Sequence, residues 1–241
     1  MEFTIDFASV RKIISEEYRR TRAEIAEEGA VRAYRHSQQR LDERLAAAPD
    51  ASTLACKAGC SWCCYFTVDV RPVEVFSILD YIHSELTSAE RERVLHEVEM
   101  NNAVLEGLNI DERSRRNLKC AFLAAGRCTI YAARPQTCRN YHATSAAGCQ
   151  QSFEEPDNLD IDPEFAPLVY QTGAAHVDAF SKAMCDAGYD IAAFELHTAL
   201  AAAMAQPTII RQRFEARQRP FADLQGAEVP LEFMEEDESP E

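Results

Sequence analysis

A chain of 241 residues, 46% of them hydrophobic, is long enough to bury a sizeable core. Its 25 basic and 40 acidic residues give a net charge of −15, which argues against non-specific binding to nucleic acid or to an anionic membrane surface. The first residues lack the basic and apolar segments of a signal peptide, and no uncharged apolar run reaches membrane-spanning length. We therefore expect a cytoplasmic protein without a membrane partner.

The first predicted element is a long helix over residues 6–48. This segment is rich in Ala, Glu and Arg and contains no proline, and Gly29 is its expected break. Its apolar side chains recur at helical intervals and would form one stripe on the helix surface: Ile14, Tyr18, Ile25, Tyr34, Leu41 and Leu45. We interpret the helix as a cover over one face of the core.

Four thiols follow within nine residues, at Cys56, Cys60, Cys63 and Cys64. Cysteines in a chain without an export signal stay reduced, so we do not expect a disulfide framework. Thiolate sulfur binds soft or borderline cations, and gaps of two or three residues let one turn of backbone direct several sulfurs at one point. The spacing predicts a metal site. Adjacent side chains tend to point apart, so Cys63 and Cys64 are expected to serve different centres, or one of them to lie outside the coordination shell.

A helical hairpin is predicted between this group and the next cysteines. Arg71-Pro72 opens a helix that runs to about Glu85, because proline is tolerated in a first helical turn. Thr87 and Glu90 form a capping box that starts a second helix. Two helices joined by so short a turn are expected to lie antiparallel, which would return the chain to the first cysteines.

The second group of thiols comprises Cys120, Cys128, Cys138 and Cys149. Short apolar and aromatic runs around a glycine predict a small β-hairpin between the first two. Proline at position 135 is expected to start a helix whose free N–H groups face the metal site. Arg134 and Arg139 would offset the negative charge of a metal held by thiolates. Aromatic side chains at Trp62, Tyr131 and Tyr141 are expected to pack around the site.

The last third is predicted to be helical over residues 164–187, 191–205 and 209–221, with stops at Gly188 and Pro207. Cys185 lies in the first of these helices, and we interpret it as an ordinary buried thiol. From Ala222 onward there are eight acidic residues and no Lys or Arg. Residues 222–241 are therefore predicted to form a disordered acidic tail.

The two cysteine blocks resemble the YkgJ-type cysteine-cluster family. The resemblance lies in the Cys-x3-Cys-x2-Cys-Cys stretch from Cys56 to Cys64 and in a run from Cys120 to Tyr141 that contains Cys128, Arg134-Pro135 and Cys138-Arg139. It implies that these cysteines chelate zinc or iron, and it leaves the metal and the reaction open. A related group includes flagellin lysine N-methylases, which implies a protein-lysine substrate as an alternative. Many of its members carry proline where this chain has Ala121.

Three other interpretations compete with metal chelation as the function. The spacing from Cys56 to Cys63 also fits the radical S-adenosylmethionine signature, but that chemistry needs a partial barrel of alternating strands and helices. One cysteine could be a nucleophile with His142 as its base, although nothing singles out one thiol. Alternatively, a purely structural zinc ion would hold a scaffold or adaptor whose helical flanks bind a protein partner.

The sequence thus predicts a mainly α protein, a helical bundle around a cysteine-rich metal site with a small irregular or β-hairpin insert. Residues 1–221 would form a single cysteine-cluster domain, with a metal-binding core over 56–149 and helical flanks over 6–48 and 164–221. Zinc or iron, including an iron–sulfur cluster, is the expected cofactor; no catalytic residue is assigned, and enzymatic activity stays open. The predicted metal ligands are Cys56, Cys60, Cys63, Cys64, Cys120, Cys128, Cys138 and Cys149.

Overall fold

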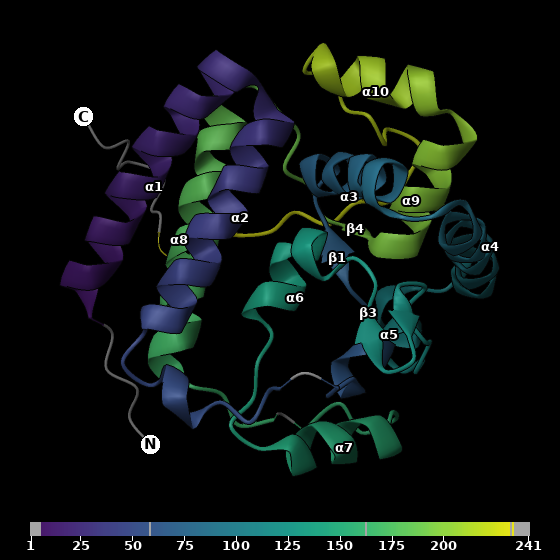
Figure 1. The fold of residues 1–241 in the computed structure, drawn as a ribbon, viewed down its shortest axis with the longest axis horizontal. Coiled ribbons are helices and arrows are strands. Elements are labelled where there is room, and N and C mark those ends of the chain that lie inside the picture. The colour runs from purple at the N-terminus through teal and green to yellow at the C-terminus, as the bar shows by residue number, and fades with distance from the viewer. Residues whose placement is uncertain (1–5, 58, 162, 232, 234–241) are drawn as a thin grey trace.

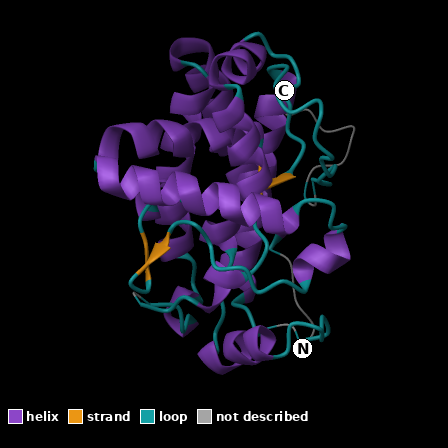
Figure 2. Cartoon of the chain, turned by 90° about the vertical axis from the view of Figure 1, so that its right-hand side faces the viewer, coloured by secondary structure: helices purple, strands orange, loops and turns teal. Residues whose placement is uncertain are grey.

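The computed structural model describes residues 6–57, 59–161, 163–231 and 233, and these are mostly helical (Figures 1 and 2). The predicted mainly α class with a small β insert is confirmed. The strands of the described part are two residues long, so the barrel that radical S-adenosylmethionine chemistry needs is not formed there. The helices are α1 (Phe7–Glu28), α2 (Ala30–Ala47), α3 (Pro72–Glu85), α4 (Ser88–Leu105), α5 (Ile110–Ser114), α6 (Gln136–Asn140), α7 (Ala146–Glu154), α8 (Pro167–Asp186), α9 (Leu196–Ala205) and α10 (Pro207–Glu215), and the strands are β1 (Asp69–Val70), β2 (Leu123–Ala124), β3 (Arg127–Cys128) and β4 (Phe194–Glu195).

Helices α1, α2 and α8 pack side by side as one layer of the molecule (Figure 1). Gly29 breaks the predicted N-terminal helix into α1 and α2, as expected, and its φ of 84° lies in the region that favours glycine. Because the chain reverses there, the predicted apolar stripe is shared between two helices that face each other and α8.

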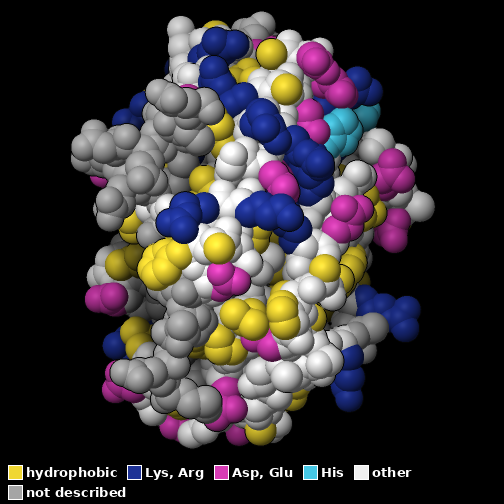
Figure 3. All heavy atoms as spheres, turned by 90° about the vertical axis from the view of Figure 1, so that its left-hand side faces the viewer, with side chains coloured by type: hydrophobic (Ala, Val, Ile, Leu, Met, Phe, Trp, Pro, Cys, Tyr) yellow, Lys and Arg dark blue, Asp and Glu magenta, His cyan; other side chains and the backbone are white. Residues whose placement is uncertain are grey.

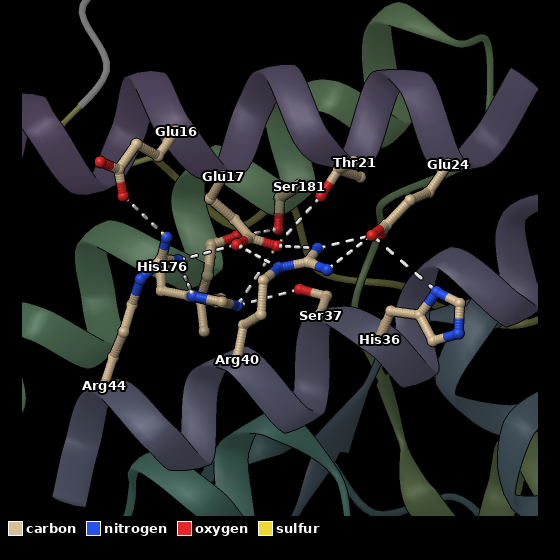
Figure 4. Close-up of polar contacts among 11 residues, drawn as sticks. Glu16, Glu17, Thr21, Glu24, His36, Ser37, Arg40, Arg44, His176 and Ser181 are labelled. Carbon is tan, nitrogen blue, oxygen red and sulfur yellow. Dashed lines mark hydrogen bonds and ion pairs between the residues drawn. The ribbon is translucent and has the colours of Figure 1, made fainter.

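A buried polar cluster joins these three helices (Figure 4). The carboxylate of Glu17 on α1 is fully buried and accepts hydrogen bonds from Arg40 at 2.7 Å and Arg44 at 2.7 Å, both on α2. Arg44 also donates to Nδ1 of His176 on α8 at 2.6 Å, and Nε2 of that ring lies 2.9 Å from Ser37 Oγ. Buried charges are tolerated when every partner is paired, so the cluster fixes one alignment of the three helices.

The outer face of α1 is strongly charged. Arg11, Lys12, Arg19 and Arg20 are exposed there, and Figure 3 shows acidic side chains lying among the basic ones on this side of the molecule. The helix therefore buries only the narrow face that meets α2 and α8.

The predicted α3–α4 antiparallel hairpin is wrong. Both helices have the expected bounds, and the capping box is present, because Thr87 N–H donates to Glu90 Oε2 at 3.0 Å and Glu90 N–H to Thr87 Oγ1 at 3.3 Å. Helix α4 nevertheless packs against α9, and Figure 1 shows α3 from the side and α4 end-on. Leu86 and Thr87 have extended backbone, which redirects the chain without reversing it.

The main apolar core runs from the α1–α2–α8 layer into α3, α9 and α10. Tyr34 and Phe180 meet with ring centroids 5.5 Å apart, and Phe76 and Phe214 meet at 4.6 Å. Burying each such ring stabilises the fold by about 2 kcal/mol. One continuous apolar cluster thus connects the two predicted helical flanks.

The bounds of all three helices in the last third differ from the sequence prediction. Helix α8 begins at Pro167 rather than residue 164, because Glu164 O accepts a hydrogen bond from Thr144 N–H at 2.8 Å in an extended connection. Helix α9 begins only at Leu196, because Phe194 and Glu195 pair with β1 as an antiparallel strand. Helix α10 begins at Pro207 and ends at Glu215, six residues before the expected end at residue 221.

The segment after Phe221, predicted to begin a disordered tail, contacts the folded body in its described part. Ala227 and Ala193 exchange backbone hydrogen bonds of 2.9 and 2.8 Å. Gly226 lies so close to Phe194 that a Cβ there would be 2.7 Å from the ring. Residues 232 and 234–241 of the predicted tail lie outside the described residues. No helix in the described ranges combines the length and apolarity needed to cross a bilayer.

Candidate metal centre

The two cysteine groups, far apart in sequence, are joined by backbone hydrogen bonds. The N–H of Cys120 donates to the carbonyl of Cys64 at 2.8 Å. On the other side, Ala55 N–H donates to Ala143 O at 2.9 Å, and Ala143 N–H donates to the sulfur of Cys56 at 3.4 Å. The expected meeting of the two groups is therefore observed, although it does not come from an antiparallel hairpin.

A tight loop and a 3₁₀ turn position the first four thiols. Gly59 has a φ of 91°, which other residues rarely adopt, and the turn is closed by a hydrogen bond from Cys60 N–H to Lys57 O at 3.0 Å. The following 3₁₀ turn, Trp62–Tyr65, carries Cys63 and Cys64.

Three separate elements and one connecting segment hold the second group of thiols. Cys128 lies on β3 opposite Leu123, and Cys120 immediately precedes this hairpin. The predicted hairpin is confirmed, and its turn residues Ala125 and Gly126 both have positive φ, which is typical of a tight two-residue connection. Cys138 lies on α6, and Cys149 lies on α7.

Aromatic contacts hold α7 against the 3₁₀ turn. The ring of Phe153 lies 5.2 Å from Trp62 and 4.9 Å from Tyr65, measured between centroids. Helix α7 was not predicted, and these contacts bring its Cys149 to the first cysteine group. The expected packing of Trp62 is thus observed, whereas Tyr131 and Tyr141 are 61% and 39% exposed and do not enclose the site.

One set of neighbouring thiols gathers around Cys149. Burial raises the pKa of Cys149 to about 11, and the negative charges of Cys56, Cys63 and Cys60 contribute to the rise. Burial likewise raises the pKa of Cys56, with contributions from Cys63 and Cys60. Charges act on one another in this way over about 10 Å, so these four side chains lie in one region of the structure.

A second set gathers around Cys138. Burial raises its pKa well above the usual value, and the charges of Cys120, Cys63 and Cys128 raise it further. Burial raises the pKa of Cys120 to about 12, again with contributions from Cys128 and Cys63. Burial also raises the pKa of Cys128. Cys63 therefore belongs to the surroundings of both sets.

Cys63 and Cys64 form the joint between the two sets. A hydrogen bond between the two side chains is the largest cause of the raised pKa of Cys63, and burial adds to it. The two thiols therefore influence each other directly, and their expected assignment to different centres stays a prediction.

Cationic side chains flank the thiols, as predicted, but the start of α6 does not face them. Arg134 lowers the pKa values of Cys56, Cys63, Cys128 and Cys138, although larger effects raise each of them. The first free N–H of α6, that of Gln136, donates to the buried carboxylate of Glu74 at 2.8 Å, so it is not available to an anionic centre. Arg139 mainly ties the fold together, through Asp42 and the carbonyl of Ala132.

Two further residues have no hydrogen bond to the clustered thiols in the described part of the chain. The ring nitrogens of His142 face backbone carbonyls, Nδ1 at 2.8 Å from Asn140 O and Nε2 at 3.4 Å from Ala166 O, so neither is hydrogen-bonded to a cysteine. This arrangement gives no support to a cysteine nucleophile with His142 as its base. Cys185 is exposed on the last turn of α8, not buried as predicted.

The donor set fits a soft or borderline metal ion. All eight clustered cysteines are free thiols, and seven of them are at least partly buried. Within the described ranges, no three His, Cys, Asp or Glu side chains are already arranged around a common point to hold a metal ion. Ligation therefore requires these neighbouring thiols to turn toward a shared centre and lose their protons.

Comparison with known families agrees with this donor set. Residues 55–162 match the model of the CxxCxxCC family, described as a "putative zinc- or iron-chelating domain". This segment is similar to the cysteine-cluster domains that the model describes. The match covers slightly less than half of the chain and contains all eight clustered thiols. No curated protein and no solved structure matches the chain significantly. The YkgJ subtype of the cysteine-cluster domain stays a prediction.

Proposed function

We propose that the cysteine-cluster domain binds metal at two adjoining centres, each with four thiolate ligands drawn from both cysteine groups. The observation that carries this proposal is that backbone hydrogen bonds join the two cysteine groups, from Cys120 N–H to Cys64 O at 2.8 Å and from Ala55 N–H to Ala143 O at 2.9 Å. The effects of the thiols on one another's pKa values support their division into two sets that share Cys63 and Cys64. One centre takes Cys56, Cys60 and Cys149, the other takes Cys120, Cys128 and Cys138, and each is completed by one thiol of the joint. Four thiolates around one ion form the usual closed site for zinc.

The metal at these centres is zinc or iron. Four thiolates suit a zinc ion and equally suit an iron–sulfur cluster, because soft sulfur donors serve both. Half-buried thiols with raised pKa values are protonated near neutral pH, so a bound cation has to displace their protons. Arg134 supports either form, because it lies near enough to both sets to stabilise negative charge on sulfur. We expect the domain to work in a reducing compartment such as the cytoplasm.

Cysteine-to-serine variants test the proposed division. Cys149→Ser and Cys138→Ser each remove one ligand from a different centre, so each protein, purified without oxygen, is expected to carry about half of the wild-type metal content. Cys185→Ser is the matched control, because this thiol is exposed at the end of α8, and it is expected to retain the full content. Equal loss in all three variants, or no loss in the first two, would contradict the division.

An enzyme related to the protein-lysine N-methylases is a second candidate. Such an enzyme needs a cleft beside the cluster that is lined by carboxylates. A cavity of about 390 Å³ is lined by Asp69 and Asp178, but it lies on the side of α6 away from the thiols, so only its lining supports this candidate. Transfer of a labelled methyl group from S-adenosylmethionine to flagellin or another lysine-rich protein tests this candidate, and the absence of labelled lysine would count against it. The adaptor interpretation has less support. It depends on apolar surface that α4 exposes, where Met100 and Val104 lie one turn apart.

A further inference from the structure

The cavity next to α6 lies on the opposite side of that helix from the cysteine sets. Gln136, Thr137 and Asn140 line it from α6, whereas Cys138 on the same short helix does not. Helix α8 forms another wall, where Gly173 allows close approach, since a Cβ there would be 1.8 Å from Asn140 Oδ1. The cavity is thus built by packing between helices and is distinct from the cysteine site.

Several buried polar atoms of the residues that line this cavity have no hydrogen-bond partner among the described residues. Gln136 is 1% exposed, and both its Nε2 and its Oε1 are unpartnered; Asn140 Oδ1 and Arg71 Nε are unpartnered as well. Leaving such groups unsatisfied destabilises the folded state, and native structures contain few of them. Because folding has already removed water from these atoms, a ligand that pairs with them gains more per hydrogen bond than it would at an open surface.

The cavity wall also carries charges of both signs. Arg71, which is 7% exposed, lines the cavity together with Asp69 and Asp178. Arg recognises a carboxylate through its fixed fork of N–H donors, and a pair of carboxylates attracts an ammonium group. Two tyrosines, Tyr141 and Tyr170, add aromatic surface.

We propose that this cavity binds a small zwitterion, an α-amino acid with a large side chain or a close derivative of one. Arg71 receives its carboxylate, Asp69 and Asp178 receive its ammonium group, and the amide of Gln136 pairs with a further donor and acceptor on the ligand. The volume of about 390 Å³ is of the size that small-molecule pockets have. Val229 and Pro230 of the C-terminal segment close part of the cavity, so the ligand enters beneath that segment.

Metal-loaded full-length protein, screened by thermal shift and calorimetry against the twenty common L-amino acids, tests the proposal. At least one of them is expected to raise the melting temperature of the wild type and to bind in calorimetry. Its methyl ester, which lacks the carboxylate, and its N-acetyl form, which lacks the ammonium group, are each expected to bind at least about tenfold more weakly. If none of the twenty binds, or if blocking either charged group leaves affinity unchanged, the proposal is wrong.

The decisive variant is Gln136→Leu. It removes two unpartnered polar atoms from a buried position, so it is expected to leave the melting temperature unchanged or to raise it while weakening ligand binding about tenfold. Gln171→Leu is the matched control, since Gln171 is also buried at 3% exposure but donates to Asp6 O and does not line the cavity. The control is expected to bind like the wild type.

Asp178→Asn separates ligand binding from folding at the ammonium end. In the native protein, Phe233 N–H donates a hydrogen bond to Asp178 at 2.8 Å. The asparagine side chain has the same shape and an oxygen that can accept this bond, and the substitution removes the negative charge. Binding is expected to weaken about tenfold with metal content unchanged. Metal content is measured on the same samples, so that failure of the ligand site can be distinguished from failure of the metal centres. A Gln136→Leu protein that binds the ligand like the wild type would overturn the ligand site and leave the metal centres unaffected.

Discussion

His176 provides a quantitative test of the buried cluster that aligns α1, α2 and α8. Its side chain is fully buried, and its Nδ1 lies 2.6 Å from a guanidinium nitrogen of Arg44, which can only donate. Nδ1 must therefore accept, so the ring is neutral and carries its proton on Nε2, near Ser37 Oγ and Glu17 Oε1. Protonating Nδ1 would set two cationic donors against each other.

The expected cost of protonation follows from the pKa of this ring. Burial, together with the charges of Arg44 and Arg40, lowers the pKa of His176 from 6.5 to about 4, although Glu17 acts in the opposite direction. Between these two values the unfolded chain binds a proton that the folded chain does not, so acidification favours unfolding. At about 1.36 kcal/mol per unit, the folded state loses about 3 kcal/mol as the pH falls from 6.5 to 4.

Urea unfolding, followed by circular dichroism at pH 7 and pH 4.5, measures this loss. His176→Gln keeps a neutral polar side chain and is expected to lose about 2 kcal/mol less than the wild type between the two pH values. His36→Gln is the control, because this side chain lies at the surface beside Glu24, and it should behave like the wild type. The low pKa of Glu17, which Arg40 lowers to about 2 despite the burial of the carboxylate, acts mainly below this window. The same pH dependence in wild type and His176→Gln would refute the assignment of a neutral, buried ring.

Two further substitutions test how the sites are held. Gly173→Ala places a Cβ 1.8 Å from Asn140 Oδ1 and is expected to lower the free energy of unfolding by about 1–3 kcal/mol, whereas Gly148→Ala meets only ordinary contacts and should be nearly neutral in the same thermal melts. Equal melting temperatures for these two variants would argue against the close packing of α6 on α8. Phe153→Ala removes both ring contacts that hold α7, so we expect about 3 kcal/mol of destabilisation and faster loss of metal to a chelator. Chelation kinetics like those of the wild type would show that α7 does not hold a ligand.

Local patterns predicted the helices and caps well. Gly29 and the Thr87–Glu90 box were read correctly, because glycine conformation and capping depend on a few adjacent residues. The relative direction of α3 and α4 could not be read in this way, since α4 turns its apolar side chains to α9, more than ninety residues later in the chain. Strand β4 was missed for a similar reason, because two residues pair only through the distant β1.

The cysteine set was visible in the sequence, but its internal order was not. Spacing marks Cys149 and Cys138 equally as ligand candidates, and only the packing of α7 through Phe153 and the placement of α6 separate them into two sets. The sequence contains even less indication that the cavity residues form a site. Gln136 and Arg71 look like ordinary polar residues until their unpartnered atoms are found on one buried wall.

In the proposed function, sulfurs from both cysteine groups surround the same metal centres. X-ray absorption at the metal edge of protein purified without oxygen tests it most directly, because the first coordination shell reports the donor atoms. Zinc or iron is expected with a shell of four sulfurs at about 2.3 Å, in about half of the wild-type amount in Cys149→Ser and in Cys138→Ser. A first shell of nitrogen and oxygen at about 2.0–2.1 Å, or protein without bound metal, would contradict the claim.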